Sequence, residues 1–444
     1  MYLSDYHTHC SLSFDSKTPV EDMVRAGIAQ GLQEMCLTDH VDLFRPRETA
    51  HWEHDFSNHE ETFAHADQAA DGKIIVRRGI ELGEAMRDFA YADELLSRLP
   101  ELDFVIGSQH QLSEKYDFSL GGNIRIYTYL DPELQNYLET LADASETDKS
   151  YSVLDNRTHG FKAYYSTVGP IRRLPGSLIK PLLVYAPALE EDLISPATPV
   201  LDEKTDFGGY EPKNFSGTYS GYISVRESLA KSVNIPAVKI LNSTGVSKAA
   251  EYMKKLGLEI PADDYSLALA LGGMKEGFSL NELINAYSAF PNGGEYFSSG
   301  FIRKIVIDGR SAYHKNDRAM RVFSDDTAYL INDMLKTAAQ SGTAKKLRPL
   351  ALPIAAKTGT SGTKSGNTDA YALSYTTEDC VGVWLGNADN SPMDITGGGL
   401  PCNIALKINE YLYSTHAPSD FVKPDGIESV TLDKAEYYAT HNIM

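Results

Sequence analysis

The chain lacks the features of a membrane-spanning protein and of a disulfide-rich one. None of its apolar runs approaches the ~20 residues that a bilayer-spanning helix needs. Its start, MYLSDYHTHCSLSFDSK, has no basic segment followed by an apolar one, so it is not a secretory signal peptide, and we expect a cytoplasmic chain. The few cysteines form no CxxC pair, so we predict buried free thiols, no disulfides and no structural zinc. They are Cys10, Cys36, Cys380 and Cys402.

Basic side chains are scarce relative to acidic ones. The sequence has 41 Lys and Arg against 61 Asp and Glu, which gives a formal net charge of −20 and a pI of about 5.0. Such a surface repels phosphate backbones and anionic lipid, so we expect no nucleic-acid partner. The hydrophobic fraction of 42% is ordinary for a folded protein, and 444 residues predict two or three domains at roughly 100–200 residues each.

Histidine is unevenly distributed along the chain. Eight of the twelve histidines lie before residue 111, in a segment where strand and helix patterns alternate. Strand-like runs such as EMCLTDH and KIIVRRGIEL are separated by helical patterns, which predicts βαβ units and a parallel sheet. Polar residues gather at the strand ends, where parallel α/β barrels carry their sites, and imidazole with carboxylate favours a metal site. These residues are His7, His9, Asp39, His40, Glu81 and His110.

The strand–helix alternation stops near residue 122. Gly121–Gly122 is the predicted seam, because glycine pairs punctuate the chain between structural units. We therefore predict a first domain over 1–122, a second over 123–425 and a C-terminal tail over 426–444. The stretch GIESVTLD within the tail is expected to add an edge strand or to act as a linker.

A serine nucleophile is predicted in RLPGSLIKPLLVYAPALEE. Pro175 and Gly176 interrupt the chain ahead of an apolar run that predicts a buried helix, and Ser177 and Lys180 share one face of it. A lysine in a dry site can lose its proton and then act as the base that activates a serine hydroxyl. Taken alone, this spacing also fits a pair of side chains that face solvent.

A second element lies in ESLAKSVN, where Ser232 and Asn234 are two residues apart. In an extended or turn segment both side chains point the same way. A serine there can relay a proton to a leaving amine, and an asparagine can hold a substrate amide. The alternative is an ordinary turn at the end of a helix.

A third element lies in LPIAAKTGTSG, where the apolar run predicts a strand. Lys357 can bind a carboxylate with help from the hydroxyls of Thr358 and Thr360. Gly359 lets substrate approach the backbone closely. The backbone N–H of Thr360, together with that of Ser177, could form an oxyanion hole. A glycine-kinked edge strand is the alternative. The residues are Lys357, Thr358, Gly359 and Thr360.

SxxK, SxN and KTG in this order form the signature of penicillin-binding proteins and β-lactamases. Residues 123–425 resemble the transpeptidase domain of a class A penicillin-binding protein, through RLPGSLIKP, ESLAKSVNIPAVKI, AAKTGTSG and DAYALSYTTEDCVGVWLGN. The resemblance implies an α+β, β-lactamase-like fold and a D,D-transpeptidase that acts on peptidoglycan stem peptides, is acylated by β-lactams and uses no cofactor. It makes Ser177 the nucleophile, Lys180 the acylation base and Ser232 a proton shuttle. The implied substrate-binding residues are Asn234, Lys357, Thr358, Gly359 and Thr360.

The chain departs from that family in two respects. A class A protein carries a membrane anchor and a glycosyltransferase domain ahead of this region and works outside the cytoplasm, whereas neither part is present in this sequence. No glutamate-based deacylation motif can be placed. Its absence favours a slow-turnover transpeptidase over a β-lactamase.

The first segment resembles a PHP-family phosphoesterase of the histidinol-phosphatase type, through DYHTHCSLSFD, CLTDHVD, RRGIELGE and DFVIGSQHQL. The resemblance implies a distorted α/β barrel in which divalent metal (zinc, manganese or iron) activates water for phosphate-ester hydrolysis. Because no Asp-x-His pair follows later in the chain, we expect a partial barrel and a partial metal site. The implied ligands are His7, His9, Asp15, His40, Glu81 and His110.

Three functions follow as hypotheses. The first is acyl transfer through Ser177 in cell-wall synthesis. The second is metal-dependent hydrolysis of histidinol phosphate by residues 1–120. The third treats the chain as a non-functional chimaera of two truncated genes, because the two chemistries share no substrate.

Overall fold

The computed structural model describes residues 3–44, 51–83, 88–99, 102–108, 124–141, 147–307, 309–316, 318–363 and 365–440. The chain divides into two compact units: unit 1 comprises residues 1–125 and 306–313, and unit 2 comprises residues 126–305 and 314–444. The predicted seam at Gly121–Gly122 and the predicted ligand His110 lie outside the described residues.

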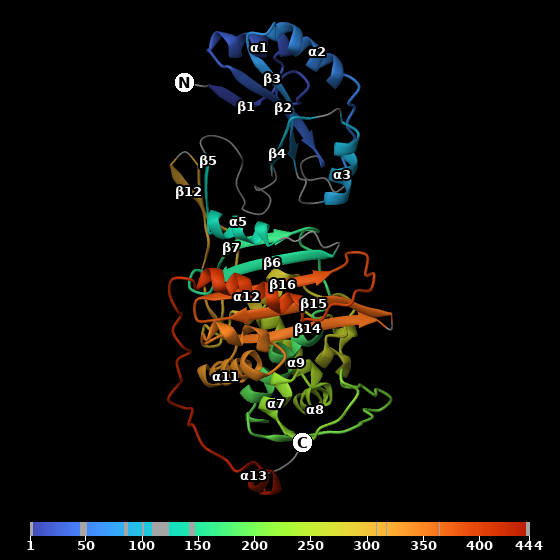
Figure 1. Ribbon diagram of the computed structural model, residues 1–444, viewed down its shortest axis with the longest axis vertical. Coiled ribbons are helices and arrows are strands. Elements are labelled where there is room, and N and C mark those ends of the chain that lie inside the picture. Colours follow the sequence, from blue (N-terminus) through green and yellow to red (C-terminus); the bar gives the residue numbers. More distant parts are fainter. Residues whose placement is uncertain are drawn as a thin grey trace. The chain divides into compact units, whose positions relative to one another are not determined.

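Unit 1 is built on a four-stranded sheet in the order β1-β2-β3-β4, and each neighbouring pair is parallel (Figure 1). The predicted βαβ alternation is confirmed, since a helix separates each strand from the next. The sheet is the parallel half-barrel expected from the sequence. Its strands are β1 (Ser4–Thr8), β2 (Glu34–Asp42), β3 (Ile75–Gly83) and β4 (Phe104–Ser108), and its helices are α1 (Val20–Ala29), α2 (His59–Ala70) and α3 (Phe89–Ser97).

The two faces of this sheet have opposite chemistry. Met35 and Leu37 of β2 pack in one apolar cluster with residues of α1 and α2, and Ile80 of β3 packs in another with residues of α3. Since successive side chains of a strand point to opposite faces, the residues between them face away from the helices. That second face carries His40 and Glu81.

Unit 2 contains a five-stranded antiparallel sheet in the order β14-β15-β16-β6-β7. Strands from the beginning of the unit therefore lie beside strands from near its end, with β6 paired to β16 from Asp148↔Gly386 to Asp155↔Asp379. The strands are β6 (Asp148–Asp155), β7 (Gly160–Ser166), β14 (Ala355–Thr363), β15 (Gly366–Tyr375) and β16 (Asp379–Gly386).

Helices cover both faces of this sheet. In β16, Val381 and Val383 pack in one apolar cluster with α5 (Pro132–Thr140) and α12 (Leu400–Leu412), which runs along the sheet in Figure 1. Cys380 and Trp384 face the other way and pack against a larger helical layer. The result is the α+β arrangement predicted for this region. That layer includes α6 (Ala186–Glu190), α7 (Val225–Ala230), α8 (Asn234–Thr244), α9 (Val246–Lys255), α10 (Leu280–Tyr287) and α11 (Asp325–Ser341).

Three small sheets complete the described part of the chain. They pair β8 (Pro199–Asp202) with β9 (Gly221–Ser224), β10 (Glu295–Tyr296) with β13 (Met320–Arg321), and β12 (Arg310–His314) with β11 (Ile302–Ile307) and β5 (Ile124–Thr128). The tail does not add the edge strand that was one expectation, because residues 426–433 form no strand and lead to helix α13 (Lys434–Thr440).

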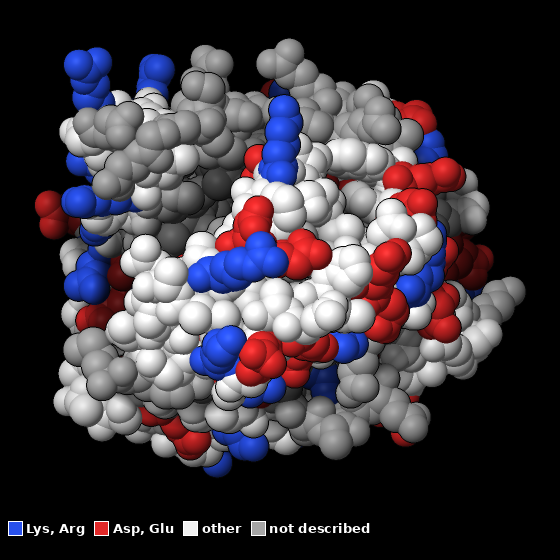
Figure 2. Space-filling model, turned by 90° about the horizontal axis from the view of Figure 1, so that it is seen from above, with Lys and Arg blue, Asp and Glu red and all other residues white. Residues whose placement is uncertain are grey.

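The composition-based predictions can be compared with the fold. All four cysteines are free and buried, as predicted. Within the described part of the chain, no helix has the length and apolar character to cross a membrane. On the face drawn in Figure 2, the described acidic and basic side chains are interspersed, and no broad field of one sign is visible.

Candidate active site and metal cluster

Ser177 lies on a tight turn rather than on a regular α-helix. A short 3₁₀ helix, Gly176–Leu178, leads into a π-helix, Lys180–Tyr185, and then into α6. The predicted buried helical segment is present, but Pro181 and Pro187 lack an N–H, so a continuous α-helical ladder cannot run through it. Wide π turns of this kind recur at functional sites.

Lys180 is fully buried beneath Ser177. Its ammonium donates to the Ser232 carbonyl at 2.8 Å, to Asn234 Oδ1 at 2.7 Å and to the Val233 carbonyl at 3.2 Å. Burial, reinforced by the charge of Lys357, holds the pKa of Lys180 well below its usual value. The Ser177 hydroxyl has no hydrogen bond to Lys180 here, so the lysine is held by the SxN segment instead.

Ser232 lies in the turn between α7 and α8, and Asn234 is the first residue of α8. Ser232 has a φ of 58°, in the left-handed region, and its Oγ accepts from Lys357 Nζ at 2.8 Å and from Lys180 Nζ at 3.4 Å. Asn234 also bonds Lys180, so both side chains point toward the same lysine, as the spacing predicted. The turn therefore ends α7 and also accepts hydrogen bonds from both buried lysines.

Lys357 lies on β14, the edge strand of the sheet, and is fully buried. Besides Ser232 Oγ, its ammonium donates to the Thr358 carbonyl at 2.8 Å. Burial lowers the pKa of Lys357 to about 7. The Thr358 hydroxyl donates to Thr343 Oγ1 at 2.7 Å, and Thr360 Oγ1 accepts the Gly397 N–H at 3.1 Å.

Two glycines let the serine turn press against β14. Gly176 has a φ of 51°, and a Cβ placed on it would lie 2.4 Å from the Thr360 carbonyl oxygen. A Cβ on Gly359 would lie 2.7 Å from the Pro175 carbonyl oxygen. The sequence predicted that substrate approaches the backbone closely at Gly359. In the structure, the segment that carries Ser177 makes this close approach instead.

A buried ion pair anchors the same segment, and sequence reasoning missed it. Arg173 Nε donates to Asp369 Oδ1 at 2.6 Å, with side-chain exposures of 9% and 2%. The carboxylate also accepts bonds from Ser361, Thr368 and Trp384. Because the partners are 196 residues apart, no local pattern indicates the pair.

A cavity of about 390 Å³, called here the serine cleft, brings these elements together. Lys180, Lys357 and Gly359 are not among the residues that line it. Sequence reasoning did not single out Phe215, Thr343 or Thr396. The lining residues are Ser177, Phe215, Lys231, Ser232, Asn234, Leu271, Thr343, Thr358, Thr360, Thr396 and Gly398.

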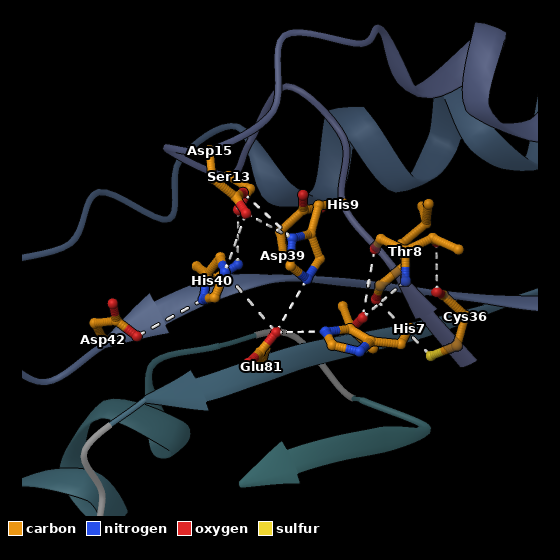
Figure 3. Close-up of polar contacts among 12 residues, drawn as sticks. His7, Thr8, His9, Ser13, Asp15, Cys36, Asp39, His40, Asp42 and Glu81 are labelled. Carbon is orange, nitrogen blue, oxygen red and sulfur yellow. Dashed lines mark hydrogen bonds and ion pairs between the residues drawn. The ribbon is translucent and has the colours of Figure 1, made fainter. Parts of the chain in front are cut away.

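Five of the predicted metal ligands converge in unit 1 and are called here the metal cluster (Figure 3). His7 Nε2 and His9 Nε2 lie 2.6 Å and 3.0 Å from Glu81 Oε2. Asp15 Oδ2 lies 3.1 Å from His9 Nδ1 and 3.3 Å from His40 Nε2. The members, His7, His9, Asp15, His40 and Glu81, form two groups of three, each with its ligand atoms within 4.8 Å of one another.

The donor set fits a divalent transition metal. Ligands about 2.0–2.1 Å from a tetrahedral ion lie about 3.3–3.4 Å apart, which is near the separations in the cluster. Burial acts against the ionised form of Asp15, but hydrogen bonds from Ser13 and His9 outweigh it and lower the pKa. Asp39, also at a strand end, instead accepts the N–H of Cys10 at 2.6 Å.

Comparison with known proteins finds a matching family model for each part of the chain. The model of the penicillin binding protein transpeptidase domain matches residues 149–391, more than half of the chain. The chain belongs to this transpeptidase family. Within it, the sequence is 32% identical to penicillin-binding protein 1F of Bacillus subtilis (strain 168) over 64% of this chain and 43% of that protein. It is also 32% identical to penicillin-binding protein 1A of Streptococcus pneumoniae, over 57% of this chain and 38% of that protein. The chain thus spans less than half the length of these curated relatives.

Solved structures share the transpeptidase fold. The penicillin-binding protein PonA1 from Mycobacterium tuberculosis superposes with a TM-score of 0.64 at 19% identity, over 72% of this chain and 96% of that one. The same protein in complex with penicillin V gives a TM-score of 0.58.

The PHP domain model matches residues 5–173 and therefore overlaps the transpeptidase match. Structure assigns the overlap to unit 2, because β6 and β7 pair with each other and β6 pairs with β16. His159, between these strands, stacks on Phe297 with ring centroids 3.8 Å apart. The PHP-like fold of the described residues is thus a partial barrel, as predicted.

Proposed function

We propose that unit 2 is a serine D,D-transpeptidase that cross-links peptidoglycan stem peptides and that β-lactams acylate the same serine. The observation that carries this is the convergence of two fully buried lysines, Lys180 and Lys357, on the Ser232 hydroxyl below Ser177. Neither lysine has an ion pair with a described carboxylate, and burial disfavours the charged form. A neutral amine is therefore available as a base.

In the proposed acylation, Ser177 Oγ attacks the carbonyl carbon of the scissile amide and its proton passes to Lys180 Nζ. The N–H groups of Ser177 and Thr360 would stabilise the oxyanion, which the contact of Gly176 with Thr360 supports. The leaving amine takes a proton from Ser232 Oγ, which a lysine replaces, and the C–N bond breaks. A second stem-peptide amine then attacks the ester and restores the serine.

Substrate recognition is assigned to the β14 side of the cleft. Lys357 in its protonated form would bind the terminal carboxylate, and that negative charge would raise the pKa of Lys357 above about 7. Thr358 and Thr360 line the cleft, and Asn234, which also lines it, would hold a substrate amide.

Mass spectrometry of the intact full chain after incubation with benzylpenicillin tests this proposal. One adduct is expected, and peptide mapping should place it on Ser177. The adduct should be lost in Ser177→Ala and kept in Ser243→Ala, which removes an exposed hydroxyl bonded only to the Lys239 carbonyl among described residues. Labelling that survives Ser177→Ala would refute the assignment, and no labelling of folded protein would favour the chimaera hypothesis.

The metal cluster supports a second function, namely divalent metal binding and hydrolysis of a phosphate ester such as histidinol phosphate. His7, His9 and Glu81 would hold one ion, since both Nε2 atoms already converge on one Glu81 oxygen. When bound, zinc, manganese or iron would supply Lewis-acid chemistry and an activated water. Asp15 orients His9 through Nδ1.

Metal content and phosphatase activity separate the parts of this second proposal. Protein dialysed against each metal and then against buffer should retain metal, and phosphate release from histidinol phosphate should stop with chelator. Retained metal without phosphate release would confirm the site and refute the phosphatase. No retained metal with any of the three would refute both.

A further inference from the structure

Lys231 is the one residue with a charged side chain among the described residues that line the serine cleft. The other lining residues are uncharged, and most of them carry a hydroxyl or an amide. Lys180 and Lys357, by contrast, are fully buried and lie outside that lining. They are already assigned to acylation and to the terminal carboxylate. The charge of Lys231 therefore has no role in the reaction proposed above, although it lies where a ligand would bind.

The backbone of Lys231 is held beside the SxN turn, which begins at the next residue. Its N–H bonds the Glu227 carbonyl at 2.9 Å at the end of α7. The turn is also fixed by another loop, because Asn214 Oδ1 accepts the Asn234 N–H at 3.0 Å and the Asn214 side chain donates to buried Asp202 at 2.7 Å. The ammonium of Lys231 is therefore presented to ligand groups on the SxN side of the cleft.

The carboxylate that pairs with Lys231 is shared with a second lysine. Glu227 Oε1 accepts from Lys231 at 3.2 Å, and Glu227 Oε2 accepts from Lys434 of α13 at 2.8 Å. The hydrogen bonds from Lys434 and Lys231 lower the pKa of Glu227, so this carboxylate is ionised at neutral pH. Two ammonium groups share one carboxylate, and a positive charge remains. The Lys231 side chain is 58% exposed, so it can turn toward a ligand without leaving a buried contact.

A carboxylate is the ligand group that this arrangement favours. The chain has a formal net charge of −20, so most of its surface repels an anion, whereas Lys231 attracts one locally. We propose that Lys231 selects acyl donors that carry a second carboxylate, next to the amide that Asn234 would hold and apart from the terminal carboxylate assigned to Lys357. This inference rests on the proposed acylation of Ser177.

Acylation rates with two penicillins test it in the full chain. Carbenicillin is benzylpenicillin with one added carboxylate on the carbon beside the side-chain amide, and both compounds have the ring carboxylate. In Lys231→Gln, the ratio of the second-order rate constants, carbenicillin over benzylpenicillin, should fall about 2- to 5-fold, the range of one solvent-exposed ion pair. Added salt should lower this ratio more in the unmodified chain than in Lys231→Gln.

Glu227→Gln separates ligand binding from a structural role of Lys231. It removes the carboxylate that competes for the Lys231 ammonium, so the ratio should rise, whereas loss of a structural contact would shift the ratio the same way in both variants. Lys254→Gln is the matched control, since the exposed Lys254 pairs with Glu259 at the same 3.2 Å and is not among the residues that line the cleft. It should leave the ratio unchanged.

An unchanged ratio in Lys231→Gln, or a shift in the same direction in Lys231→Gln and Glu227→Gln, would overturn the inference while acylation by benzylpenicillin stays intact. An equal fall in Lys254→Gln would also overturn it, because the effect would then follow from net charge. If neither penicillin acylates the unmodified chain, the proposed transpeptidase fails and this inference fails with it.

Discussion

Replacing Asp369 by Asn should destabilise unit 2 by about 3–5 kcal/mol, because it breaks a buried ion pair and leaves the Arg173 guanidinium without its counter-charge. Both side chains are almost fully buried. Asn can still accept through Oδ1, and the hydroxyls of Ser361 and Thr368 can turn to new acceptors, so most of the loss lies in the unpaired charge. Apart from the substituted side chain, the Arg173 guanidinium has one further described hydrogen bond, to the Ala388 carbonyl at 3.3 Å, which does not replace the lost counter-charge.

Urea unfolding monitored by fluorescence measures this loss in unit 2 alone. The chain has two tryptophans, so in a Trp52→Phe background the signal comes from Trp384, whose Nε1 bonds Asp369 at 3.0 Å. Glu259→Gln is the control, since the Lys254–Glu259 pair is exposed by 71% and 74% and should change stability by less than about 0.5 kcal/mol. A loss below about 1 kcal/mol in Asp369→Asn would refute the reasoning.

Three further predictions concern the two sites. Gly176→Ala should lower benzylpenicillin acylation at least about 10-fold, because its Cβ would clash with Thr360 and the backbone is left-handed, whereas Gly300→Ala, which meets nothing within 4 Å, should not. Because the folded-state pKa of Lys357, about 7, lies below its unfolded value of 10.5, unfolding takes up a proton between these limits. The urea concentration at the unfolding midpoint should therefore rise between pH 7 and pH 10 by more than it does in Lys357→Met. An equal rise in the two proteins would contradict the lowered pKa of Lys357. Cobalt(II) absorbance bands on unit 1 should be lost in His9→Ala and kept in His65→Ala, an exposed histidine outside the cluster; equal bands in both would exclude His9 as a ligand.

Much of the fold followed from local patterns. In unit 1 the strands and helices alternate at the lengths that the apolar runs indicate, and the polar strand ends meet because parallel strands end at the same edge. In unit 2 the three motifs could be recognised because their serines, lysines and asparagine recur at fixed spacings, and members of all three line one cavity. Their roles stay predictions until acylation is measured.

The features that were missed depend on contacts distant in sequence. Arg173, in the segment before Ser177, pairs with Asp369 on β15, and Phe215 lies on a loop held by Asn214 and Asp202. The π-helix after Ser177 was read as an ordinary helix, since its effect on hydrogen bonding is visible only in the backbone. The ion pair, the loop and the π-helix each help to position a motif that the sequence had already indicated.

The pairing of β6 with β16 constrains how the chain can fold during synthesis. The register joins Asp148 to Gly386, so the middle of the sheet cannot form until more than 230 further residues have left the ribosome. Contacts between residues this far apart in sequence form slowly, because closing a long loop costs conformational entropy before strand pairing offsets that cost. Until then the β6–β7 hairpin has an unpaired strand edge, and such an edge can pair with another chain.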